Sequence, residues 1–185
     1  TVSGGGATGG LVRGVDIASE SVRKDLTRQI KMGSLEPLGR SGGEPAIVLG
    51  RELARTLGVI PGESVTVISP QGALTAVGMV PKMRRFTVAG TFEVGMYEYD
   101  SSLAYVSLGV AQEFAGLGDR VTGIEVKLRD PFEAKTVARA ITQRLGFAYL
   151  LRDWMEMNRN LFNALQLEKL ALFIIVTIIV LVATE

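Results

Sequence analysis

The stretch FTVAGTF (Phe86–Phe92) decides the fold class, because its side chains alternate between two faces as those of a β-strand do. Two further stretches, SVTVIS (Ser64–Ser69) and LTAVGMV (Leu74–Val80), are also typical of extended chain. SPQG (Ser69–Gly72) between them is typical of a turn, and we expect Pro81 to end the second stretch. The middle of the chain is therefore predicted to be rich in β-structure.

Shorter elements with their own start and stop signals surround this middle part. Apolar runs predict strands over LVRGVD (Leu11–Asp16), AIVLG (Ala46–Gly50) and LAYVSL (Leu103–Leu108). Apolar residues at helical spacing predict helices over about Ser19–Met32, Arg51–Gly58 and Val110–Leu117. Further on, a strand at Val121–Leu128, a helix at Pro131–Gly146 and a strand at Phe147–Leu151 predict a β-α-β unit, so the fold class is α+β.

A long helix is predicted to begin at Asp153, which forms a capping-box pattern with Glu156. It ends in the apolar run LALFIIVTIIVLVA (Leu170–Ala183), whose 14 residues reach about 21 Å, short of the roughly 30 Å hydrocarbon core. We expect a truncated transmembrane helix here; the alternative is a buried C-terminal helix. The Gly-rich start and the apolar end lead us to expect a fragment of a longer chain.

Composition excludes several function classes. Among the 185 residues, 20 Lys and Arg nearly balance 19 Asp and Glu, which argues against a general nucleic-acid binder. The chain has no Cys and no His, which excludes disulfides, thiolate zinc sites and His-based catalysis. The sequence also lacks the Gly-Lys pair of a P-loop. The formal G-x-G-x-x-G at Gly4–Gly9 is followed by a predicted strand where a dinucleotide site needs a helix. We expect no enzyme activity, metal or cofactor.

Charge is unevenly distributed around the β-rich middle. No acidic residue occurs between Ser64 and Phe92, where Lys82, Arg84 and Arg85 form a basic cluster. A hairpin with this basic base would suit an acidic or polar partner. Alternatively, its cations pair with the acidic stretch that follows, which has no basic residue as far as Asp119 and contains Glu93, Glu98, Asp100, Glu113 and Asp119. In that stretch, EVGMYEYD (Glu93–Asp100) would suit a metal or acid/base site, but such residues are also common in turns.

The order of several stretches resembles the permease subunits of the lipoprotein-releasing (Lol) ABC transporter, in the MacB/FtsX-type permease superfamily. The stretches that carry the resemblance are VRGVD (Val12–Asp16), IVLGRELARTLGV (Ile47–Val59), GESVTVISPQG (Gly62–Gly72), PKMRRFTVAGTF (Pro81–Phe92), MYEYDSSLAYVSL (Met96–Leu108), VTGIEVKLRD (Val121–Asp130) and Asp153–Ala183.

The resemblance implies a MacB-type periplasmic domain followed by a long stalk and transmembrane helix. Its parts would be a Gly-rich start and helix (1–45), a β-rich part (46–118), a β-α-β porter part (119–152), a stalk helix (153–169) and a truncated transmembrane helix (170–185). Residues 1 to about 169 would lie in the periplasm, and the helix in the bacterial inner membrane.

The family also implies partners and site residues. A protruding hairpin over 71–81, the hook, would bind the periplasmic lipoprotein chaperone through Leu74, Thr75, Ala76, Val77, Gly78, Met79, Val80 and Pro81. Lys82, Arg84 and Arg85 would form its basic base. Ala76 stands where the family often has a proline. Other implied partners are a cytoplasmic ATPase subunit, a second permease subunit, membrane lipid and the lipoprotein cargo. The acyl chains of the cargo could contact Phe162, Leu165 and Phe173. The alternative is that these three side chains pack against lipid or neighbouring helices.

Two other readings remain. One is a MacB/FtsX-type permease for efflux or mechanotransmission, which we expect to lack the hook. The other is an AbrB-type DNA-binding protein, which LARTLGVIPGESVTV (Leu53–Val67) resembles over about 15 residues.

Overall fold

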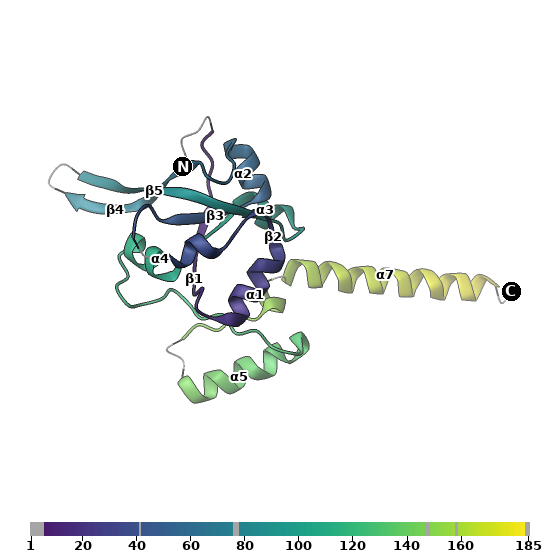
Figure 1. Ribbon diagram of the computed structural model, residues 1–185. Helices are drawn as coiled ribbons and strands as arrows, with labels where there is room; N and C mark the ends of the chain where they lie inside the picture. Colours follow the sequence, from purple (N-terminus) through teal and green to yellow (C-terminus); the bar gives the residue numbers. More distant parts are fainter. Residues whose placement is uncertain (1–5, 41, 76–77, 147–148, 158, 184–185) are drawn as a thin grey trace. The chain divides into compact units, whose positions relative to one another are not determined.

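The computed structural model describes residues 6–40, 42–75, 78–146, 149–157 and 159–183 (Figure 1). The chain divides into two compact units, Thr1–Gly123 and Ile124–Glu185. The first contains a mixed sheet with helices, and the second contains helices and irregular segments. The α+β fold class is therefore confirmed.

The sheet of unit 1 has the strand order β1-β6-β3-β5-β2, with β4 paired to β5 (Figure 1). Pairs β1–β6 and β3–β5 are parallel, whereas β3–β6, β2–β5 and β4–β5 are antiparallel. The strands are β1 (Leu11–Val15), β2 (Ile30–Gly33), β3 (Ala46–Gly50), β4 (Ser64–Thr75), β5 (Gly78–Phe92) and β6 (Leu103–Ser107).

The core lies on both faces of the central strand β3, all five of whose residues are buried. Ile47 and Leu49 pack into a cluster with Leu53 and Leu57 of helix α2 (Arg51–Leu57). Val48, on the other face, belongs to a second cluster. That cluster includes Leu26 of α1 (Glu20–Gln29), Leu38 of η1 (Glu36–Gly39), Phe92 and Tyr105. A strand covered on both faces reads as a continuous apolar run, as AIVLG does.

Most elements predicted from local pattern are confirmed in unit 1, including the strands β1, β3 and β6. Helix α2 ends at Gly58, whose φ of +66° is the left-handed conformation that glycine adopts readily. Helix α4 (Leu108–Ala115) ends in the same way at Gly116. Helix α3 (Tyr97–Ser102) was not predicted, because its six residues are too few for a helical period to appear.

The prediction of one helix over Ser19–Met32 is wrong in its last turn. Helix α1 ends at Gln29, and Ile30 begins strand β2, which pairs with the end of β5. Ile30 lies directly opposite Phe92. Sheet pairing with a strand about 60 residues away therefore overrides the local helical pattern.

Unit 2 contains η2 (Pro131–Glu133), α5 (Ala134–Leu145), α6 (Trp154–Met157) and α7 (Arg159–Ala183). The predicted helix over Pro131–Gly146 is confirmed. The strand predicted at Val121–Leu128 is wrong, since this segment is irregular, and Ile124 is among its most exposed side chains. A strand needs a neighbouring strand to pair with, and among the described strands none pairs with this segment. Phe147 and Ala148, in the second predicted strand, lie outside the described residues.

The start of the predicted long helix is held within unit 2. The Asp153 carboxylate accepts a hydrogen bond from the Glu156 backbone N–H at 2.7 Å, as the capping pattern predicts. The Trp154 indole donates to the Pro131 carbonyl at 2.7 Å and packs edge-on against Phe132. Position 158 separates α6 from α7 and lies outside the described residues.

In the described part of the chain, no helix combines the length and the apolar composition needed to cross a membrane.

Candidate partner-binding hairpin

Strands β4 and β5 form a long antiparallel hairpin that extends past β3 (Figure 1). Strand β5 pairs with β3 only from Thr87 to Phe92, whereas it pairs with β4 from Gly78 to Thr87. Among the described residues, the outer half of β5 therefore has β4 as its only strand neighbour. The hairpin predicted over 71–81 is the outer part of these two strands.

Pro81 does not end the strand, so that prediction is wrong. Ser69 lies opposite Lys82 and Ala73 lies opposite Val80, which leaves three residues of β4 facing Pro81 alone. Proline has no N–H to donate and is tolerated in strands at such irregularities. The turn-like SPQG segment is the bulged part of β4, and the strands meet beyond it, where Thr75 pairs with Gly78.

The predicted hook residues lie on both arms of this hairpin. Leu74 and Thr75 belong to β4, and their register partners are Met79 and Gly78 of β5. Val80 and Pro81 follow on β5. Ala76 and Val77 lie outside the described residues.

Two cations of the predicted basic base contact helix α4. The Lys82 ammonium donates to the Phe114 carbonyl at 3.5 Å, and the Arg84 guanidinium forms an ion pair with Glu113 at 2.7 Å. The Arg84 side chain is only 28% exposed. A cation near the last carbonyls of a helix is also favoured by the helix dipole.

The third cation lies on the other face of β5. Arg85 pairs with Glu44 at 3.0 Å, and the same carboxylate accepts a hydrogen bond from the Thr87 hydroxyl at 3.0 Å. The Arg85 side chain is 70% exposed, so this pair is well solvated and contributes less than about 1 kcal/mol. The three predicted cations therefore lie on two faces of β5, and each of them has a partner within unit 1.

Sequence reasoning anticipated one of these partners and missed the others. Glu113 belongs to the acidic stretch that was the alternative partner of the basic end, and that alternative is confirmed for Arg84. Glu44 precedes Pro45 in a Gly-rich loop, where nothing in the sequence distinguishes it. The Phe114 carbonyl is a backbone group and carries no sequence signal.

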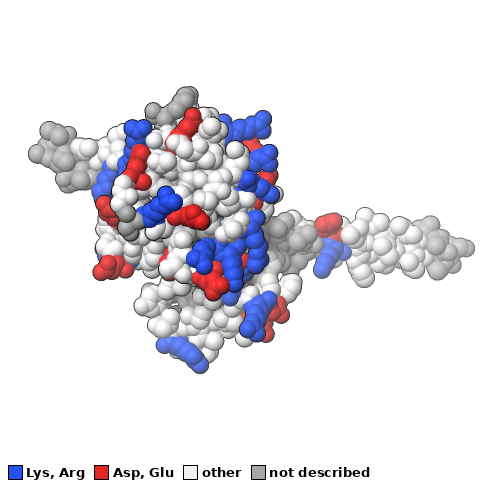
Figure 2. Space-filling view, in the orientation of Figure 1, with Lys and Arg blue, Asp and Glu red and all other residues white. Residues whose placement is uncertain are grey.

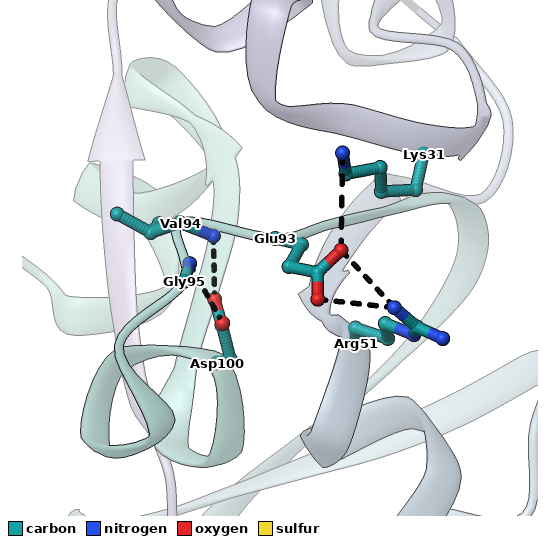
Figure 3. Close-up of polar contacts among 6 residues, drawn as sticks. All are labelled: Lys31, Arg51, Glu93, Val94, Gly95 and Asp100. Carbon is teal, nitrogen blue, oxygen red and sulfur yellow. Dashed lines mark hydrogen bonds and ion pairs between the residues drawn. The ribbon is translucent and has the colours of Figure 1, made fainter.

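Within the acidic stretch, Glu93 and Asp100 hold neighbouring elements in place (Figure 3). The buried Asp100 carboxylate accepts hydrogen bonds from the backbone N–H groups of Val94 at 2.7 Å and Gly95 at 3.1 Å. Glu93 accepts hydrogen bonds from Arg51 at 3.0 and 3.1 Å and lies 3.8 Å from Lys31, linking β5 to α2 and β2. In the described part of the chain, no group of three or more His, Cys, Asp or Glu residues is arranged to hold a metal ion.

The visible surface of unit 1 carries both signs of charge. Figure 2 shows basic and acidic side chains interleaved on this face, without the continuous basic surface that nucleic-acid binding needs.

The proposed acyl-chain residues all belong to α7. Phe173 is exposed, as are the neighbouring aliphatic side chains of this helix. The side chains of Phe162 and Leu165 lie outside the described part of the structure.

A family model described as the MacB-like periplasmic core domain matches residues 1–144, which include the whole of the β4–β5 hairpin. The chain belongs to this family. This membership confirms the MacB-like fold expected from the sequence and gives no support to the AbrB-type reading.

Curated relatives carry more specific names. The chain is 41% identical over 170 residues to the "Lipoprotein-releasing system transmembrane protein LolC" of Xylella fastidiosa (strain 9a5c), covering 92% of this chain and 40% of that protein. It is 37% identical over 182 residues to the protein of the same name from Neisseria meningitidis serogroup B, covering 96% of this chain and 44% of that protein. The LolE protein of Haemophilus influenzae is 24% identical over 174 residues, which cover 93% of this chain and 41% of that protein. The chain thus spans less than half the length of these relatives.

Proposed function

We propose that this MacB-like chain is part of a permease subunit of a lipoprotein-releasing ABC transporter in the bacterial inner membrane, with its sheet-containing unit in the periplasm. The similarity to LolC proteins over 92% of the chain carries the proposal. The relatives' names, rather than the fold, separate it from an efflux or mechanotransmission permease.

The β4–β5 hairpin is the proposed docking element for the periplasmic lipoprotein chaperone. Its outer part has no other strand beside it among the described residues, so no described strand occupies the edges where a partner could pair. Of the described hook residues, Val80 is about half exposed, which suits an apolar contact. The basic base adds three cations to a hairpin that has no acidic residue.

The chain itself would be non-catalytic, and a separate cytoplasmic subunit would hydrolyse ATP. We propose that residues 153–169 form a stalk and 170–185 the start of a transmembrane helix, which couples movement of the membrane part to the periplasmic parts. Residues 1–45 and 46–118 would build the hairpin-bearing part, and 119–152 the porter part around α5. Phe162, Leu165 and Phe173 would face lipoprotein acyl chains or neighbouring membrane components, among them a second permease subunit.

The test is binding of the chaperone to the full permease complex in detergent. One variant replaces residues 70–81 with Asn-Gly, a pair that suits a two-residue hairpin turn next to the Ser69–Lys82 pair. A second changes Lys82, Arg84 and Arg85 to Ala. The matched control changes three cations of α1, Arg23, Lys24 and Arg28, to Ala; two of these are likewise ion-paired with carboxylates.

We expect the intact complex and the α1 control to bind, and both hairpin variants to lose binding. Absence of binding by an assembled, folded intact complex would refute the chaperone-docking role. Full binding by the variant without residues 70–81 would move the docking site away from the hook.

A further inference from the structure

Three alternate residues of β5 meet the C-terminal end of helix α4. Lys82 donates to the Phe114 carbonyl, Arg84 pairs with Glu113, and the Phe86 ring packs edge-on against the Phe114 ring, with 6.3 Å between ring centroids. Positions i, i+2 and i+4 of a strand share one face. One face of the hairpin base therefore packs against the last turn of α4.

The two faces of β5 differ in exposure at this level. On the α4 side, Phe86 is 1% exposed and Arg84 is 28% exposed. On the opposite side, Met83 is 63% exposed and Arg85 is 70% exposed. The contacts to α4 thus cover one face of the hairpin base, whereas the other face has only the solvated contacts to Glu44.

Helix α4 can hold the hairpin base in place because its own position is fixed by contacts with β1 and with the segment that follows it. A Cβ added to Gly14 of β1 would lie 2.5 Å from the Cβ of Ala111, so α4 packs against β1 at a distance that leaves no room for a side chain at position 14. The helix end is closed by Gly116 at φ +69°, and the Gln112 side chain donates to the Arg120 carbonyl at 3.0 Å. These contacts tie α4 to the sheet and to the segment that follows it.

We propose that the last turn of α4 is a brace that sets the direction of the β4–β5 hairpin, with Glu113 and Phe114 as positioning residues. Arg84 then acts through Glu113 and does not itself contact the docking partner. The inference rests on the proposed function, since it concerns how the hairpin is presented to the chaperone. A two-stranded hairpin is marginally stable by itself, and a partner that had to order it would bind more weakly.

The test uses the full permease complex and two readouts. Chaperone affinity is measured together with amide hydrogen exchange in the outer parts of β4 and β5. The variants are Glu113→Gln, Arg84→Glu and the charge exchange that combines Arg84→Glu with Glu113→Arg. Asp119→Asn is the matched control, because it removes an exposed carboxylate that has no described contact with β5.

We expect Glu113→Gln to weaken chaperone binding about two- to fivefold, the range for loss of one solvated ion pair, and to speed exchange in the hairpin. Arg84→Glu should weaken binding further, and the charge exchange should restore both readouts. Asp119→Asn should change neither.

Tighter binding by Glu113→Gln would overturn the inference, because it would mean that Glu113 masks an arginine used directly by the partner. The same holds if the charge exchange restores slow hydrogen exchange without restoring binding. If the intact complex does not bind the chaperone, the proposed function fails, while hydrogen exchange still tests the brace. Unchanged exchange in Glu113→Gln would then refute the brace itself.

Discussion

Replacing Asp100 by Asn is predicted to destabilise unit 1 by about 2–3 kcal/mol, because it removes a hydrogen bond to a buried charged carboxylate. Asp100 is 5% exposed, and its two carboxylate oxygens accept from two different backbone N–H groups. Asn keeps one acceptor oxygen and turns an NH2 group toward the other N–H. Flipping the amide only exchanges which N–H is left without a partner.

Native-state hydrogen exchange of the β3 and β6 amides in the purified chain measures this loss, because these central strands report on opening of unit 1. A loss of 2–3 kcal/mol corresponds to exchange that is faster by about 30- to 150-fold where exchange requires opening of the unit. Glu98→Gln is the matched control, since it changes an exposed carboxylate in the same segment and should shift stability by less than about 0.5 kcal/mol. An Asp100→Asn effect as small as the control's would refute the structural role of Asp100.

Three further predictions concern other described contacts. Gly33→Ala should lower the free energy of unfolding by more than about 2 kcal/mol, because Gly33 has φ +77° and an added Cβ would overlap the Ala89 carbonyl. The control Gly42→Ala, at φ +96° in open space, should lower it by only about 1–2 kcal/mol. Equal losses for the two variants in urea unfolding would contradict this prediction. Burial raises the pKa of Tyr105 above its ordinary 10.0, so the unfolded chain releases this proton first and unfolding free energy should fall as pH rises above 10.0. Tyr105→Phe should flatten that fall, and an unchanged slope would contradict it. Trp154→Phe removes the hydrogen bond to Pro131, so it should speed exchange at the start of α6 by about two- to tenfold while leaving β3 unchanged.

The sequence allowed prediction of elements whose causes are local. Strand β3 and helix α2 follow from an apolar run and a helical repeat that ends at Gly58, and the structure has both. The hairpin and the pairing of Arg84 with the acidic stretch could also be predicted, because alternation and charge are local features of about 30 residues.

Elements that depend on distant partners could not be predicted. Strand β2 exists because Ile30 meets Phe92, and Pro81 stays within β5 because the bulge of β4 lies opposite it. Conversely, Val121–Leu128 was predicted as a strand from its own residues, but no described strand pairs with it. Register and pairing are long-range properties, and a single sequence carries little information about them.

The same distinction changes how the basic cluster should be understood. The sequence alone suggests that three cations, Lys82, Arg84 and Arg85, are available to an acidic partner. In the structure each already has an acceptor, so a partner carboxylate would exchange one polar contact for another, with a net gain of less than about 1 kcal/mol. If the hairpin docks a partner as proposed, most of the docking free energy would then come from apolar contacts of the hairpin and not from these cations. On the proposed positioning role, Lys82 and Arg84 would contribute to docking chiefly by fixing the direction of the hairpin through their contacts with α4.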